Sequence, residues 1–343
     1  MIELKEGALQ IGPFLTFTIG IIVLFLGKRI NDAVGFLREF SIPEPVTGGL
    51  LFSILTALVY AVSDVAINFE LGARDFLLVY FFTTIGINAS IKDLLEGGKP
   101  LVILLVITIA YMVLQNVIGV SVARLFDLSA AVGLLGGTVS LIGGHGTAIA
   151  WAPKISEQFG IANAMEIGLA CATFGLILAS LMGGPIAKFL ISRYKLTPKK
   201  TEPLDVGTAQ QGDKTSISSY QFLDSILAIH VCIIIGLILN EIVKQFGLDL
   251  PLFVTCLFAG ILITNLMPHT FPRLTRMPWP NRTPTIALIA DISLGAFLAM
   301  SLMSMQLWTL VELAGPIVAI LVVQFLFAVV INIFMVFPAL GRT

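Results

Sequence analysis

The stretch Gly136-Gly-Thr-Val-Ser-Leu-Ile-Gly-Gly-His-Gly-Thr-Ala-Ile-Ala-Trp151 interrupts a series of apolar runs, and the path of the chain around it decides the fold. Its glycines permit positive φ and close approach of other backbones, so successive amides and carbonyls can point at a ligand. Three hydroxyl groups in the same stretch, Thr138, Ser140 and Thr147, add side-chain oxygens. The stretch therefore has the composition of a binding loop.

The composition of the whole chain is that of a membrane protein. Of 343 residues, 57% are hydrophobic and only 12% are charged, and the mean hydropathy is +0.98. A soluble domain usually carries about 25% charged residues. Runs such as Leu101 to Gln115 and Ile317 to Phe337 are apolar on every face, so lipid or other apolar helices must surround them. The net charge of −1 offers no basic field for nucleic acid, which excludes that class of partner.

The apolar runs predict nine membrane spans, because each crossing needs about 20 apolar residues. Polar, Gly or Pro clusters delimit the expected spans: 12–27, 46–67, 76–95, 100–125, 162–189, 222–246, 251–267, 285–305 and 315–337. A shorter stretch, Ala130 to Ala152, contains the glycine-rich segment. The polar segment 195–219 has the composition of a solvated linker.

Basic residues orient these spans, since cytoplasmic loops are enriched in Lys and Arg. Lys28, Arg29 and Arg38 place the first loop inside and the N-terminus outside, and the basic linker 195–219 is also inside. With the N-terminus outside, four spans bring the chain back to the outside before this stretch. The next span, 162–189, must run from the outside to the linker inside, so the stretch Ala130 to Ala152 cannot cross. It is expected to enter and leave by the outer face as a re-entrant hairpin, and backbone of that kind usually lines a site.

The second half of the chain repeats the first. The segment from Ile42 to Phe52 aligns with the segment from Leu250 to Gly260, and Gly98-Lys-Pro-Leu-Val with Gly315-Pro-Ile-Val. The charge pattern places the second half upside down, which is typical of secondary transporters. We expect an all-α polytopic membrane protein of two inverted-topology repeats of five spans each with a re-entrant glycine-rich hairpin. The N-terminal repeat is 1–194, the linker 195–219, and the C-terminal repeat 220–343 is expected to be truncated before its hairpin and last span.

Polar groups in or near the spans give the candidate residues of a translocation path. Hydroxyl and carbonyl oxygens suit a hard cation such as sodium, and free amides at a broken helix suit a carboxylate. The candidate sodium ligands are Ser140, Thr147 and Asn88. The candidates for the substrate and ion path are Thr138, Ser140, Gly143, Gly144, His145, Gly146, Thr147, Asn88, Gln115, Asn116, Glu166 and Thr173.

Each of these candidates also has a structural interpretation. The glycines can serve only to pack helices tightly, and Gln115 or Asn116 can form plain hydrogen bonds between helices. His145 can donate to a substrate carboxylate, titrate with protons, or simply cap loop carbonyls. No ATP-binding Gly-Lys-Ser/Thr loop or metalloprotease spacing is present, so the chain is not expected to be an enzyme. A channel and a membrane enzyme are the rival classes to a transporter.

Five segments resemble the bacterial sodium/glutamate symporter family. They are Ile42-Pro-Glu-Pro-Val-Thr-Gly-Gly-Leu-Leu, Phe82-Thr-Thr-Ile-Gly-Ile-Asn-Ala, Gln115-Asn-Val-Ile-Gly, Ser140-Leu-Ile-Gly-Gly-His-Gly-Thr and Ala170-Cys-Ala-Thr-Phe-Gly-Leu-Ile-Leu. The resemblance implies import of L-glutamate with sodium as the coupling ion, a homodimer in the bacterial inner membrane, and a path lined by residues 143–147. A sodium-coupled carrier of citrate or another dicarboxylate is the alternative, because helix-end amides do not distinguish between carboxylates.

Overall fold

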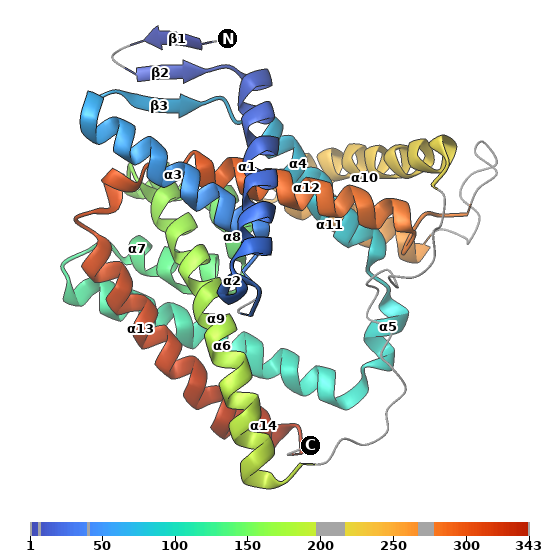
Figure 1. Cartoon of the computed structure of the whole chain (residues 1–343). Helices are drawn as coiled ribbons and strands as arrows, with labels where there is room; N and C mark the ends of the chain where they lie inside the picture. The colour runs from blue at the N-terminus through green and yellow to red at the C-terminus, as the bar shows by residue number, and fades with distance from the viewer. Residues whose placement is uncertain (1, 6–7, 40–41, 197–216, 267–277, 342–343) are drawn as a thin grey trace. The chain divides into compact units, whose positions relative to one another are not determined.

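The computed structural model describes residues 2–5, 8–39, 42–196, 217–266 and 278–341, and these residues are mostly helical (Figure 1). Most of the predicted linker 195–219 lies outside the described residues. The α-helices are α1 Pro13–Ala33, α2 Gly35–Glu39, α3 Glu44–Ser63, α4 Gly72–Asn88, α5 Ile91–Glu96, α6 Gly98–Leu125, α7 Ala130–Leu134, α8 Gly144–Phe159, α9 Ala164–Tyr194, α10 Ser219–Gln245, α11 Leu252–Leu266, α12 Pro284–Met303, α13 Ala314–Ile331 and α14 Phe337–Ala339. Shorter helical turns are η1 Leu135–Val139 and η3 Asn332–Val336, which are π-helical, and the 3₁₀ turn η2 Leu307–Leu310.

Seven helical segments within the described ranges are long and apolar enough to cross a membrane. They are α1, α3, α6, α9, α10, α12 and the continuous run from α13 to α14. On α6, Val102, Val106 and Val113 are 60%, 61% and 63% exposed, although water would disfavour such a surface. An apolar exposed surface of this kind suits lipid, and with the seven apolar segments it confirms the prediction of a polytopic membrane protein.

Two of the predicted spans end several residues earlier than expected. The predicted span 46–67 is helical only to Ser63, because Asp64 adopts a left-handed conformation with φ 56° and ends the helix. The predicted span 76–95 stops at Asn88 and continues as the separate short helix α5. The apolar pattern therefore located these helices but overestimated their lengths.

A small sheet departs from the expected all-α class. Its strands are β1 Ile2–Lys5, β2 Ala8–Ile11 and β3 Ala66–Phe69 (Figure 1). Strand β1 pairs antiparallel with β2, and β2 pairs parallel with β3. Strands of four residues are too short to show a two-residue hydrophobic alternation, and the first two residues of β3 lie within the predicted span 46–67. The sheet lies outside the helices and does not change the assignment of the spans.

The chain forms two compact units, which are composed of 1–71, 97–199 and 298–343, and of 72–96 and 200–297. These units interleave in sequence, so they differ from the predicted repeats 1–194 and 220–343. The division into units reflects which residues contact one another in the folded chain. It does not test whether the two halves of the sequence are repeats of inverted topology. The inverted repeat therefore stays a prediction.

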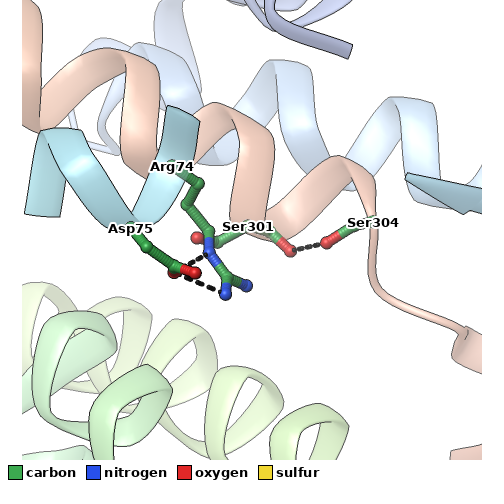
Figure 2. Close-up of polar contacts among 4 residues, drawn as sticks. All are labelled: Arg74, Asp75, Ser301 and Ser304. Carbon is green, nitrogen blue, oxygen red and sulfur yellow. Dashed lines mark hydrogen bonds and ion pairs between the residues drawn. The ribbon is translucent and has the colours of Figure 1, made fainter. Parts of the chain in front are cut away.

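The second unit packs around an apolar core that includes Tyr80, Ile229 and Trp279. Helices α4 and α11 approach closely there because Gly86 of α4 lies against the backbone of α11. Arg74 is buried in α4, and its guanidinium donates from Nε and Nη2 to Oδ1 of Asp75 at 2.9 and 2.7 Å (Figure 2). All three cysteines of the chain are buried and free, as expected for small apolar side chains.

In the first unit, α1 and α3 are in backbone contact. A Cβ atom on Gly48 of α3 would overlap the carbonyl oxygen of Val23 in α1, so only glycine fits. Two hydrogen bonds hold the same pair: Asn31 Nδ2 donates to the Ile42 carbonyl at 2.7 Å, and Thr47 Oγ1 donates to Asn31 Oδ1 at 2.7 Å. The chain entering α3 is thereby fixed against α1.

We predict that Gly48→Leu destabilises the protein, because the side chain would have to separate two backbones in contact. Overpacking of this kind costs about 1–3 kcal/mol or more. The midpoint of thermal unfolding of the purified protein in detergent should fall by several degrees, whereas Gly183→Leu, at an exposed position in α9 with open space, should leave it nearly unchanged. An equal fall in both variants would contradict the contact.

Candidate functional site

The glycine-rich stretch folds as two helical arms separated by a break. The first arm is α7 followed by η1, in which Gly137 has non-helical angles of φ −109° and ψ −133°. The second arm, α8, begins at Gly144, whose φ of +69° favours glycine. Ten and sixteen helical residues span about 15 and 24 Å, and the hydrocarbon core is about 30 Å thick. Neither arm can cross a membrane alone.

Glycines let these arms approach their neighbours. A Cβ atom on Gly133 of α7 would lie 2.5 Å from the backbone of Gly119 in α6. On the other side, a Cβ atom on Gly168 of α9 would lie 3.1 Å from Ala148 Cβ in α8. Close helix packing explains these two glycines, and these contacts place the arms against α6 and α9.

Asn116 of α6 supports the break at Gly137. Its Oδ1 atom accepts hydrogen bonds from the Thr138 backbone N–H at 3.1 Å and from Thr138 Oγ1 at 2.8 Å. A Cβ atom on Gly137 would lie 2.8 Å from the same Oδ1 atom, so the missing side chain opens this access. Asn116 thus replaces the backbone partner that Thr138 loses where the helix is interrupted.

The second group of polar contacts lies between the hairpin residues and α9. Ser140 Oγ donates to the Gly168 carbonyl at 3.0 Å, and both groups are buried. His145 Nε2 lies 2.9 Å from Thr173 Oγ1, and Thr173 Oγ1 donates to the Leu169 carbonyl at 2.8 Å. A hydroxyl has one proton to donate, so His145 Nε2 must be the donor to Thr173. In a neutral ring this leaves Nδ1 as the acceptor.

The turn between the arms is built from backbone groups. The Thr138 carbonyl accepts from the amides of Ile142 and Gly143 at 3.3 and 3.0 Å. A Cβ atom on Gly143 would overlap the side chain of Thr147, so glycine is required where the turn meets α8. Gly146 is buried and Thr147 is partly buried. The structure thus brings the predicted residues 138–147 together in one turn.

Two predicted site residues have other surroundings. Asn88 belongs to the second unit, at the C-terminal end of α4, where its Oδ1 accepts from the Arg282 N–H at 2.7 Å. Glu166 lies partly buried in the first turn of α9, close to the helix N-terminus, where a carboxylate interacts favourably with the helix dipole. The predicted sodium ligand set of Ser140, Thr147 and Asn88 therefore stays a prediction.

Gln324 of α13 is a site residue that the sequence prediction missed. It is 2% exposed, and its Nε2 donates to the backbone carbonyl of Gln115 in α6 at 2.7 Å. Gln115 itself is 3% exposed. A lone polar residue in the apolar run of α13 is visible in the sequence, and the same signal singled out Gln115. This signal does not show which residue is the partner.

The oxygen atoms gathered around the break belong to neutral hydroxyl, amide and carbonyl groups. In the part of the chain that the structure describes, no three His, Cys, Asp or Glu side chains gather as a group that could hold a metal ion. Neutral oxygens suit hard cations and not the soft or redox metals. The arrangement can therefore bind an alkali ion or the polar ends of an organic solute.

We predict that Asn116→Ala destabilises the protein, because it removes the acceptor of two hydrogen bonds and leaves the Thr138 N–H unpaired. The cost is about 1–3 kcal/mol, visible as a lower thermal midpoint in detergent. Asn116→Asp keeps an oxygen at this position, so its thermal midpoint should fall much less. If the alanine variant unfolds at the wild-type temperature, Asn116 does not support the break.

Comparison with known proteins gives a consistent result. A family model described as sodium/glutamate symporter matches residues 9–343. A protein of Escherichia coli (strain K12) named sodium/glutamate symporter is 36% identical over 331 residues, which are 95% of this chain and 80% of that protein. A protein of the same name from Haemophilus influenzae is 35% identical with the same coverage. No solved structure matches the chain.

Proposed function

The chain belongs to the sodium/glutamate symporter family, and we propose from this membership that it is a secondary transporter that carries L-glutamate into the cell with sodium. The family match over residues 9–343 is the observation that carries the proposal. Sodium is the coupling ion, and the family is one of transporters and not of enzymes. These matches give no support to the alternative of a citrate or dicarboxylate carrier.

The broken helix offers the groups that such a cycle needs. In this proposal the turn from Gly143 to Thr147 lines the path, where backbone amides can meet a substrate carboxylate. The neutral His145 ring donates from Nε2 to Thr173, so its Nδ1 can accept a hydrogen bond from the substrate ammonium group. This assignment differs from the expected donation to a carboxylate, which would need a different tautomer or a charged ring.

Coupling follows from differential binding. If sodium raises the affinity for glutamate, glutamate must raise the affinity for sodium by the same factor. The ordered oxygens around Asn116 and Thr138 could provide this linkage, since an ion that fixes the break also fixes the turn that follows it. Movement between outward and inward access then carries both solutes together.

The membrane arrangement is part of the proposal. We infer a multi-pass protein of the bacterial inner membrane, with the N-terminus outside, the linker in the cytoplasm, and the stretch 130–152 re-entrant from the outer face. The short arms of this stretch support the last point. Two inverted repeats and a homodimer are further expectations from the sequence pattern and the family resemblance.

Cysteine labelling tests this orientation. We predict that Ser63→Cys reacts with a membrane-impermeant maleimide added to intact cells, whereas Lys92→Cys reacts only after permeabilisation. Both positions are exposed, and the three native cysteines are buried, so the background should be low. The reverse pattern would invert the proposed topology, and labelling of both from outside would contradict the single crossing proposed between them.

Uptake of radiolabelled L-glutamate tests the function. The full-length protein in proteoliposomes should accumulate glutamate above equilibrium only when an inward sodium gradient is imposed. Excess unlabelled citrate should not compete. Sodium-independent equilibration would instead indicate a channel, and competition by citrate would discard the assigned substrate while leaving the fold unaffected. Aspartate competition measures selectivity among acidic amino acids.

A further inference from the structure

Two buried amide oxygens in the first unit have no hydrogen-bond partner among the described residues. They are the Oε1 atoms of Gln115 on α6 and Gln324 on α13, in side chains that are 3% and 2% exposed. An amide oxygen that leaves water without a partner is disfavoured, and native proteins seldom keep one. Two of them on contacting helices indicate that something absent from the polypeptide binds there.

The orientation of the Gln324 amide is fixed by its other atom. Nε2 donates to the Gln115 carbonyl at 2.7 Å, so the two atoms cannot be exchanged without placing two oxygens against each other. The Gln324 oxygen is therefore held close to the turn of α6 that carries Gln115. Gly119 gives the room for this contact, because its Cβ would lie 3.3 Å from Nε2.

The same turn of α6 lies against the break in the hairpin. A Cβ atom on Gly137 would be 3.5 Å from the Gln115 carbonyl oxygen, and the neighbouring Asn116 binds Thr138. Gly136 packs on Ile320 of α13, where a Cβ would lie 2.7 Å from Cγ2. The unpartnered oxygens thus occur where α6, α13 and the interrupted helix meet.

The kind of group missing can be inferred from what is unpaired. The two unpaired atoms are both acceptors, so the missing group is a hydrogen-bond donor or a cation. A buried water could donate one proton to each oxygen. A hard cation is the other candidate, since neutral amide and carbonyl oxygens are its ligands, and the proposed function supplies sodium.

We propose that Gln115 and Gln324 are ligands of a sodium ion at the junction of α6, α13 and η1. This inference rests on the proposed function, which makes sodium the coupling ion, and it assigns ligands that differ from Ser140, Thr147 and Asn88. The site is assembled from residues distant in sequence. Sodium binding would join α13 to the hairpin arm through α6.

Sodium binding without glutamate gives the first test. The thermal midpoint of the purified full-length protein is measured against sodium concentration, with choline replacing sodium. Gln115→Met keeps the size of the side chain and removes its polar atoms, and it should weaken the apparent sodium affinity about tenfold or more. Gln115→Glu lacks the same NH₂ group but keeps an oxygen, so it should retain sodium binding.

Gln306→Met is the matched control, since it removes an amide of the same unit that is partly buried and bonded to Asn68. It should lower the midpoint without changing the sodium affinity. If Gln115→Met binds sodium as the wild type does, the proposal is wrong. If Gln115→Glu loses sodium affinity as completely as Gln115→Met, the oxygen is not the ligand, and the proposal is likewise overturned.

Hydrogen exchange on the wild type gives a test that does not depend on the folding of a variant. Sodium alone should slow exchange in peptides of 130–139 and 314–331. Protection by glutamate but not by sodium would overturn the proposal and assign the two oxygens to the substrate ammonium group. Failure of the proposed function is distinguishable, because it appears as absent glutamate accumulation by the wild type. Failure of this inference alone appears as unchanged sodium affinity in Gln115→Met, while the wild type still accumulates glutamate with sodium.

Discussion

The contact between Gly119 and Gly133 is the constraint on which the candidate site depends. Apolar helices gain little from burial against each other in lipid, so close packing and hydrogen bonds must hold them together. With no Cβ on either residue, α7 reaches the backbone of α6. This contact lies about one turn along α6 from Asn116, which binds Thr138 of the same arm, and the space beside Gly119 admits Gln324. A side chain at either glycine would separate all three elements.

This close packing makes an interrupted helix possible inside an apolar protein. A broken backbone exposes N–H and carbonyl groups that lipid cannot satisfy, and each unpaired group is costly. Nearby protein groups supply the missing partners. Asn116 accepts a hydrogen bond from the Thr138 amide, and the Thr138 carbonyl accepts from two amides of the turn. Ser140 and His145 add bonds to α9. The hairpin is consequently held from both sides and not merely tolerated.

The sequence predicted those features that depend on local composition. Apolar runs located the spans, and clustered glycines with hydroxyls located the turn at 138–147, because both signals reside within a few consecutive residues. Pairings distant in sequence were not accessible to this reasoning. The partner of Gln115 is Gln324, 209 residues away, and the partner of Asn88 is the backbone of Arg282, 194 residues away. The strand Ala66–Phe69 was missed for a related reason, since its apolar residues fit a span equally well and only the pairing with β2 makes it a strand.

The unpaired oxygens of Gln115 and Gln324 suggest how ion binding could shift the protein between conformations. A ligand shifts a conformational equilibrium only to the extent that it binds one state better than another. Without a cation, the arrangement with two buried unpaired acceptors is disfavoured relative to any arrangement that returns them to water. With a cation, the same arrangement becomes the favoured one, and α13 is held against α6 beside the break. Because that break leads directly into the turn of Gly143 to Thr147, occupancy of the ion site and order in the substrate path would change together. Reciprocal coupling between two solutes then requires no contact between them, only a shared element that both stabilise in the same state.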